Sequence, residues 1–381
     1  VGDGVFLDGL GEPEQSPVGI HSVGMGWIMR TKVIQFFDIQ AYISGTAVRF
    51  RRKISRFAIR TKQGRMETVL SGIRSTGNLH LGNYFGALKN FVRMQHDERC
   101  FFFIADYHSL TTHPDPGMLH VNVKSVLCEY LAAGLDPDVA TIYVQSDVPE
   151  VAELSLLLGM HAFVGELERT ASFKEKIRKH PDNVNIGLLS YPVLMAADIL
   201  QHRATRVPVG KDQEQHLELT RRFARRFNQL YGVDYFPECQ PYRFGGELVS
   251  EGNGIYLSDT DEAIRKKVMK AVTDSGPTAP DSPMPEVIAN LFTLLKVVSS
   301  PDTVQFFTDK WNRCEIRYGD LKKQLAEDII RVVAPIRERI RDIAADEAYL
   351  ARVVKQGAEK ARASASTTVA DVRRIMGIKP F

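Results

Sequence analysis

Short apolar runs alternate with amphipathic helical patterns from Met66 to about residue 255. The runs expected to form strands are residues 69–72, 101–105, 141–144 and 206–209. Between them, apolar side chains recur at helical spacing in three segments. One begins at Asn83, the second includes Val126 and ends at Gly134, and the third runs from Leu219 to Leu230. This alternation predicts an α/β fold, a doubly wound parallel sheet of Rossmann-like type, over residues 66–255.

Beyond residue 255 the strand pattern stops. Asp259, followed by Glu262 three positions later, predicts the N-cap of a helix. Further helical patterns cover residues 288–298, 321–340 and 348–363, with a short amphipathic helix at 369–378. We therefore expect a smaller all-helical domain over residues 256–365 and a separate C-terminal helix over 366–381.

Residues 1–65 differ from the rest of the chain. The segment 49–65 carries eight basic side chains and no acid, whereas four acids lie before residue 15, which argues against a transit peptide. Two readings stay open: a basic arm that contacts RNA, or an extension of uncertain order that precedes a true start at Met66. The formal net charge of +3 belongs to this segment, since it holds 10 basic and 5 acidic residues and the remaining 316 hold 39 and 41.

Composition restricts the class of protein. The chain has 381 residues, 44% of them hydrophobic and 25% charged, as is typical of globular domains. Its four cysteines stand singly and form no cluster of zinc-ligand spacing, so we expect a reducing, cytoplasmic location and no metal held by the protein alone. No apolar run is long enough to span a membrane.

A glycine-rich turn follows the first predicted strand, where nucleotide-binding sheets hold their ligand. It runs from Ser71 to Asn83 with glycines at 72, 77 and 82, which permit close approach of a ligand to the backbone. His80 and Asn83 can donate hydrogen bonds to phosphate oxygens beside the start of a helix. The turn matches neither the dinucleotide nor the P-loop signature, and alone it is equally consistent with a structural turn.

Three further stretches occur in a fixed order after this turn. They are Gly165-Glu166-Leu167-Glu168-Arg169-Thr170, Tyr191-Pro192-Val193-Leu194-Met195-Ala196-Ala197-Asp198 and Val207-Pro208-Val209-Gly210-Lys211-Asp212-Gln213. With His80-Leu81-Gly82-Asn83 in the position of the HIGH-type signature, residues 66–381 resemble the class I aminoacyl-tRNA synthetases of the tryptophanyl type.

The resemblance implies a reaction and its partners. Members of this family activate L-tryptophan with ATP and Mg²⁺ to tryptophanyl-adenylate and transfer it to tRNA(Trp). It implies catalytic roles for His80 and Asn83. It assigns ATP contacts to Arg74, Ser75, Thr76, Gly82, Asn83, Gly210, Lys211, Asp212 and Ser250. A homodimer is also implied, with the helical domain reading the anticodon. Lys211 replaces a common glutamate, and Asp212 is equally suited to cap the following helix.

Tyr191, Met195 and Asp198 lie at positions i, i+4 and i+7, so one helix face carries all three. An indole ring favours polarizable contacts and needs one acceptor for its N–H. By the resemblance Asp198 is that acceptor, and Met195, where tyrosyl relatives usually carry glutamine, favours tryptophan. The alternative for Asp198 is a helix cap or a surface charge.

Other residues of the expected tryptophan site come from separate segments. Gln213 is placed there by the resemblance, as is Leu70, where the family often has an aromatic ring. His108 follows the end of a central strand, a position that suits a ligand contact or an ordinary structural histidine.

One piece of the family pattern is missing. A lysine-rich loop of the KMSKS type should follow residue 249, but Val249 runs directly into Ser250, which matches only the final serine of that signature. About a dozen residues are absent by family pattern. Three explanations are open: the segment is missing from the sequence as determined, the gene model has lost it, or the chain is a paralogue without the loop.

Two basic clusters are candidate RNA contacts or, equally, solvated helix faces. They comprise Lys174, Lys176, Arg178 and Lys179, and Arg265, Lys266, Lys267 and Lys270. The leading hypothesis is thus a tryptophan-specific ligase of this family. The alternatives are a tyrosine–tRNA ligase and a binding or regulatory paralogue without catalysis.

Overall fold

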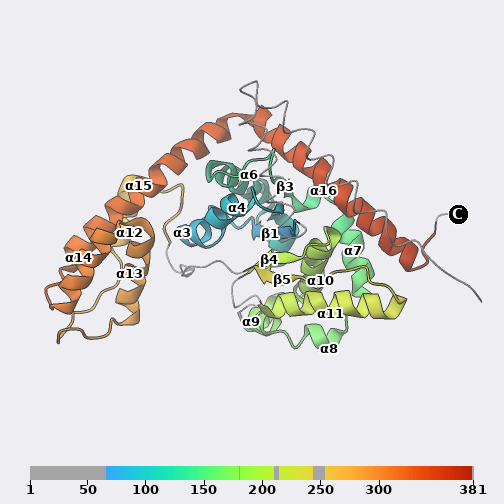
Figure 1. Ribbon diagram of the computed structural model, residues 1–381, viewed down its shortest axis with the longest axis horizontal. Coiled ribbons are helices and arrows are strands. Elements are labelled where there is room, and N and C mark those ends of the chain that lie inside the picture. Colours follow the sequence, from blue (N-terminus) through green and yellow to red (C-terminus); the bar gives the residue numbers. More distant parts are fainter. Residues whose placement is uncertain (1–65, 180, 210–213, 243–253, 380–381) are drawn as a thin grey trace, which may run out of the picture. The chain divides into compact units, whose positions relative to one another are not determined.

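A parallel sheet forms the centre of the protein. The computed structural model describes residues 66–179, 181–209, 214–242 and 254–379, and the expectations for residues 1–65 lie outside them. Within these residues the strands are β1 (Thr68–Arg74), β2 (Arg99–Ala105), β3 (Thr141–Val144), β4 (Arg206–Pro208) and β5 (Gln240–Tyr242). All four strand pairings are parallel, in the order β3-β2-β1-β4-β5, which confirms the predicted fold class (Figure 1). Strand β5 has no counterpart among the strands expected from the sequence.

The strand order locates a ligand crevice. From β1 the chain proceeds to β2 on one side, and β4 pairs with β1 on the other, with Val69 opposite Cys100 and Arg206. The winding reverses between β1 and β4, and in open sheets ligands bind at the carboxyl ends of the strands at such a point. The turn after β1 therefore occupies the expected position.

Helices cover both faces of the sheet. The helices around it are α4 (Lys89–Met94), α6 (Pro116–Ala132), α7 (Glu150–Gly159), α8 (Val164–Leu167), α9 (Ala171–Lys179), α10 (Ile186–Gln201) and α11 (Glu214–Tyr231). Phe102 of β2 packs in the cluster that contains Phe91 of α4 and Tyr130 of α6, whereas Phe101 packs in the one that contains Ile199 of α10. Alternation of side chains along a strand thus buries both faces.

The all-helical region begins after the sheet. Its helices are α12 (Asp261–Met269), α13 (Glu286–Val298), α14 (Pro301–Asn312) and α15 (Tyr318–Ala345), followed by α16 (Glu347–Ile375). Phe307 and Trp311 of α14 pack with Leu325 of α15 in one apolar cluster. The expected start of α12 is wrong by one residue: Thr260, not Asp259, is the N-cap and accepts the Ala263 N–H. Asp259 instead binds Lys267 at 2.7 Å.

The expected separate helix over 366–381 is also wrong. Residues 347–375 form one continuous helix, α16, which packs mainly along β3 and α7 (Figure 1). At Gly357 a Cβ atom would lie 1.6 Å from the Ile142 carbonyl oxygen, so only glycine permits this approach to β3. Small side chains at Ala361 and Ala365 continue the contact. Tertiary packing therefore holds α16 helical through its Ser/Thr-rich stretch.

Among the described residues, no helix combines the length and apolarity required to cross a membrane.

Candidate functional site

The helix after β1 begins at the signature residues. The sequence analysis placed its start at Asn83, but α3 (Leu81–Asn83) has His80 as its N-cap, followed by a π-helical turn at Tyr84–Leu88. His80 Nδ1 accepts the Asn83 N–H at 3.3 Å, and Asn83 Oδ1 accepts the His80 N–H at 3.1 Å. This reciprocal capping box leaves Nε2 of a neutral His80 ring as the protonated nitrogen and the Asn83 side-chain N–H groups as donors.

The turn before His80 is held from two sides. Asn78 accepts from the Ser125 hydroxyl of α6 at 2.7 Å and donates to the Ser258 hydroxyl at 2.8 Å. The main chain of residues 255–257 pairs with that of residues 79–81 at 2.9 and 3.0 Å. The start of the all-helical region therefore fixes the signature turn directly.

Arg74 connects this turn to a second group of polar residues. Its guanidinium donates to the His108 carbonyl at 3.2 Å, while its buried Nε lacks a partner among the described residues. Burial lowers the pKa of Arg74. Thr76 is exposed, but Ser75 is 1% exposed and its hydroxyl bonds to that of Ser109 at 3.0 Å. The Ser75 side chain therefore faces inward, and its expected ATP contact stays a prediction that only the main chain of Ser75 would fulfil.

Two glycines of the turn occupy positions that other residues would not accept, for different reasons. A Cβ at Gly72 would lie 2.5 Å from the Phe103 ring, and Gly77 has a φ of +125°, which other residues rarely adopt. Gly82 is buried in the first turn of the helix. A ligand at this point would approach backbone rather than side chains.

Asp198 lies at the centre of a buried hydrogen-bond group. Its side chain is fully buried on α10, with Oδ2 2.9 Å from His108 Nε2 of the short helix α5 (Asp106–Ser109). The Gln145 amide donates to both carboxylate oxygens at 2.9 Å. Burial raises the pKa of Asp198, and the His108 and Gln145 hydrogen bonds oppose this shift. Three hydrogen bonds leave the carboxylate capacity for one more donor.

The face of α10 carries the other expected residues. Tyr191 and Met195 are partly buried, and the Tyr191 hydroxyl lies 2.7 Å from Nε2 of the buried His216. Leu70 is 2% exposed and packs in the sheet core with Phe101. Gln145 and His216 were missed by the sequence analysis. Gln145 follows the carboxyl end of β3, the same kind of position that drew attention to His108, whereas no pattern distinguishes His216.

Two cations border this face. The Lys176 ammonium of α9 lies 3.8 Å from the centre of the Tyr191 ring. Burial lowers the pKa of Lys176, and the nearby positive charge of Arg74 lowers it further. Lys176 thus faces the site rather than open solvent, and with Arg74 it creates a positive environment suited to an anion.

Several expected site residues lie outside the described part of the chain. They are Gly210, Lys211, Asp212, Gln213 and Ser250, together with the junction at Val249 where the lysine loop should stand.

Comparisons with known proteins identify the family of the chain. The profile of the family described as tRNA synthetases class I (W and Y) matches residues 62–334. The chain belongs to this family. A tryptophan–tRNA ligase of Porphyromonas gingivalis is 61% identical over 327 residues, covering 82% of this chain and all of that protein. One from Caulobacter vibrioides is 40% identical over 333 residues, covering 81% of this chain and 95% of that protein.

Solved structures of class I synthetases show the same fold. Tryptophanyl-tRNA synthetase of Campylobacter jejuni, in complex with ADP and tryptophan, aligns with a TM-score of 0.71 at 31% identity, over 81% of this chain and 99% of that one. The enzyme from Mycoplasma pneumoniae aligns with a TM-score of 0.70 at 32% identity, over 83% and 99%. The expected Rossmann-like synthetase fold is confirmed.

Proposed function

We propose that this chain is a tryptophan–tRNA ligase, which activates L-tryptophan with ATP and transfers it to tRNA(Trp). The observation that carries the specificity is the buried Asp198 carboxylate, oriented by two neighbours on the helix face that also bears Met195. The match over the whole length of a tryptophan–tRNA ligase at 61% identity supports the same assignment. The tyrosine-specific and non-catalytic alternatives are not favoured.

Asp198 would accept the indole N–H of tryptophan. A bound ligand without that donor would leave the buried carboxylate under-bonded, and sites of this kind reject such ligands by about 10⁴ to 10⁵. Tyr191, Met195 and His108 would border the ring, and Leu70 would support it from the sheet core. Gln213 retains its expected role as a contact of the amino acid.

The turn after β1 would hold the phosphates of ATP. His80 Nε2 and the Asn83 amide offer donors there, and the unpartnered Nε of Arg74 suits an anion. Thr76, Gly82 and the main chain complete this part, with Gly210, Lys211, Asp212 and Ser250 expected on the opposite side. These fixed donors would stabilise charge on the α-phosphate as the tryptophan carboxylate attacks it.

Mg²⁺ would reach the site on the ATP phosphates. Within the described residues, no group of three or more His, Cys, Asp or Glu side chains is gathered in a way that could hold a metal ion. Mg²⁺ commonly binds through substrate phosphates and few protein ligands, which fits this site.

The missing lysine loop bears on catalysis. The match to the Porphyromonas ligase spans 327 positions, but 82% of 381 residues is about 312, so about 15 positions of that match have no residue in this chain. This supports an internal loss of the size expected at Val249. We propose that the complete enzyme has the loop, and sequencing of the gene between the codons for Val249 and Ser250 would decide it.

The RNA would be bound by local basic patches. Lys174 and Arg178 of α9 are exposed, as are Lys266 and Lys270 near α12, whereas Arg265 pairs with Glu327 at 2.7 Å.

We propose a cytoplasmic location, where ATP, tRNA and a reducing environment that suits the free cysteines are found together.

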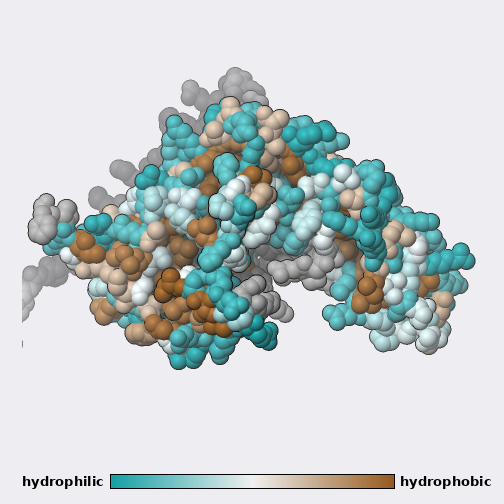
Figure 2. Space-filling view, turned by 180° about the vertical axis from the view of Figure 1, so that it is seen from behind, coloured by the Kyte–Doolittle hydropathy of each residue, from teal (hydrophilic) through white to brown (hydrophobic). Residues whose placement is uncertain are grey.

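An apolar patch on α7 and α8 suits a second copy of the chain. Four large side chains there, Leu156, Met160, Phe163 and Val164, are between 57% and 64% exposed. Figure 2 shows apolar surface gathered at the lower left, in the part of the molecule that carries α7, α8 and α11. Exposed patches of this kind mark interfaces. A homodimer would cover the patch with its own symmetric copy.

A charge in this patch should dissociate the dimer. Replacing Met160 with glutamate would place a carboxylate in an apolar interface without a partner. The molar mass measured by light scattering at micromolar concentration should therefore fall from that of a dimer, twice 42.8 kDa, to that of a single chain. Val121→Glu, a matched change at an exposed apolar residue of α6, should remain dimeric. A monomeric wild-type protein would contradict the homodimer.

The proposed reaction is tested by charging of tRNA. If sequencing shows that the lysine-rich loop was lost, it is restored before the assay. The protein should then attach radiolabelled tryptophan to tRNA(Trp) in the presence of ATP and Mg²⁺. Failure of that complete chain to charge the tRNA, or charging of tRNA(Tyr) with tyrosine instead, would exclude the assignment.

A further inference from the structure

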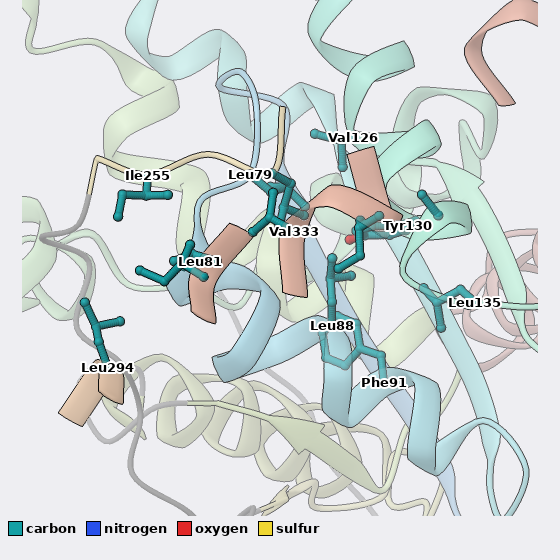
Figure 3. Packing of buried hydrophobic residues seen from close by; sticks show 14 of the residues in the cluster. Leu79, Leu81, Leu88, Phe91, Val126, Tyr130, Leu135, Ile255, Leu294 and Val333 are labelled. Atoms are coloured by element: carbon teal, nitrogen blue, oxygen red, sulfur yellow. The ribbon is translucent and has the colours of Figure 1, made fainter. Parts of the chain in front are cut away.

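A lone acid lies inside the apolar contact between α6 and the signature turn. Glu129 is 0% exposed and stands between Cys128 and Tyr130 on the buried side of α6. Figure 3 shows Leu79, Val126 and Val333 of α15 gathered around this contact. An acid is rarely buried in such surroundings unless it has a specific partner.

That partner is the main chain of the turn. Both carboxyl oxygens of Glu129 accept the Leu79 N–H, at 3.1 and 3.0 Å. Leu79 is 3% exposed, so its N–H depends on this acceptor in the absence of water. The Leu79 carbonyl, in turn, accepts the Leu257 N–H at 2.9 Å.

Leu79 directly precedes the His80 and Asn83 capping box, so the contact fixes the backbone from which both side chains project. A shift of about 1 Å in such groups can cost about 10²-fold in rate. The acid therefore acts on the turn without touching a substrate.

Within the part of the chain that the structure describes, Glu129 forms no ion pair that would explain its burial. The charged groups nearby are engaged elsewhere: Lys124 of α6 pairs with Glu347, and Arg339 of α15 donates to the Ala132 carbonyl at 2.7 Å. Burial raises the pKa of Glu129 to about 8, partly opposed by the Leu79 N–H. A carboxyl group whose pKa is raised on folding lowers the stability of the fold as the pH rises above its unfolded pKa, so stability does not explain an acid at this position.

We propose that Glu129 is a positioning residue for adenylate formation, which holds the signature turn through the Leu79 N–H so that His80 and Asn83 meet the ATP phosphates. The inference rests on the proposed function. It requires an acceptor oxygen at residue 129 rather than a negative charge.

Three variants test this role by steady-state ATP–pyrophosphate exchange and active-site titration. Glu129→Leu should lower kcat at least tenfold and raise the KM for ATP several-fold, whereas the KM for tryptophan and the titrated fraction of active sites stay within twofold of wild type. Glu129→Gln, which restores an acceptor oxygen, should keep most of the wild-type kcat. Asp328→Asn, at a buried acid of α15 bonded to Ser299 and Arg331, should lower Tm without changing kcat.

The outcomes separate the two proposals. A wild-type chain that shows no tryptophan-dependent exchange contradicts the proposed function. An active wild type with an equally active Glu129→Leu contradicts only the role of Glu129. The role is likewise overturned if Glu129→Leu lowers only the titrated fraction of active sites and not kcat. It is also overturned if Glu129→Gln lowers kcat as much as Glu129→Leu does.

Discussion

Replacing Asp198 with asparagine should lower kcat/KM for tryptophan about 10²-fold and remove most of the preference over tyrosine. A hydrogen bond to a charged group contributes about 1.5–3 kcal/mol, and each 1.36 kcal/mol corresponds to a tenfold change. The asparagine amide would also face the Gln145 amide and His108 Nε2, which both approach the carboxylate within 2.9 Å. The measurement is exchange kinetics with each amino acid.

A neighbouring acid provides the control. Asp147→Asn alters an exposed carboxyl in the 3₁₀ turn Gln145–Asp147, which the structure does not show bonded to Asp198. Its tryptophan-to-tyrosine ratio should remain that of wild type. An unchanged ratio in Asp198→Asn would refute the role of Asp198 as the indole acceptor.

Replacing His80 with alanine should lower kcat for adenylate formation by about 10² to 10³, the usual cost of removing one donor that stabilises transition-state charge. The change also removes the acceptor for the Asn83 N–H, and a lost N-cap costs about 1 kcal/mol of stability. Exchange kinetics and thermal unfolding measure the two effects separately.

His80→Asn distinguishes them, because asparagine is a good N-cap but cannot extend as far as the imidazole Nε2. This variant should recover the wild-type Tm while its kcat remains low. Full recovery of kcat by asparagine would show that His80 acts only as a helix cap.

The sheet could be predicted because its strands are unbroken apolar runs. Residues 141–144 form a strand as expected, and β1, β2 and β4 differ from their predicted bounds by one to two residues. β5 could not be found, since Gln240-Pro241-Tyr242 has no apolar periodicity and forms a strand only by pairing with β4. Similarly, the continuity of α16 depends on its contact with β3, which local propensity does not encode.

The proximity of expected site residues could be predicted where a single element carries them. Tyr191, Met195 and Asp198 share α10, so helical spacing predicted that these three residues of the family motif lie on one face. Gln145 and Glu129 act from other elements, and their roles become visible only when the sheet brings them to Asp198 and Leu79. Local patterns do not specify such long-range pairs, although the position of Gln145 after a strand end could have suggested it.

The most direct test of the account is ATP–pyrophosphate exchange by the complete chain, with its gene sequence verified at the Val249–Ser250 junction. The account predicts exchange that depends on tryptophan and is at least about 10⁴-fold less efficient with tyrosine, as expected for a buried acceptor that tyrosine leaves unpaired. No exchange with tryptophan, or exchange driven by tyrosine alone, would contradict it.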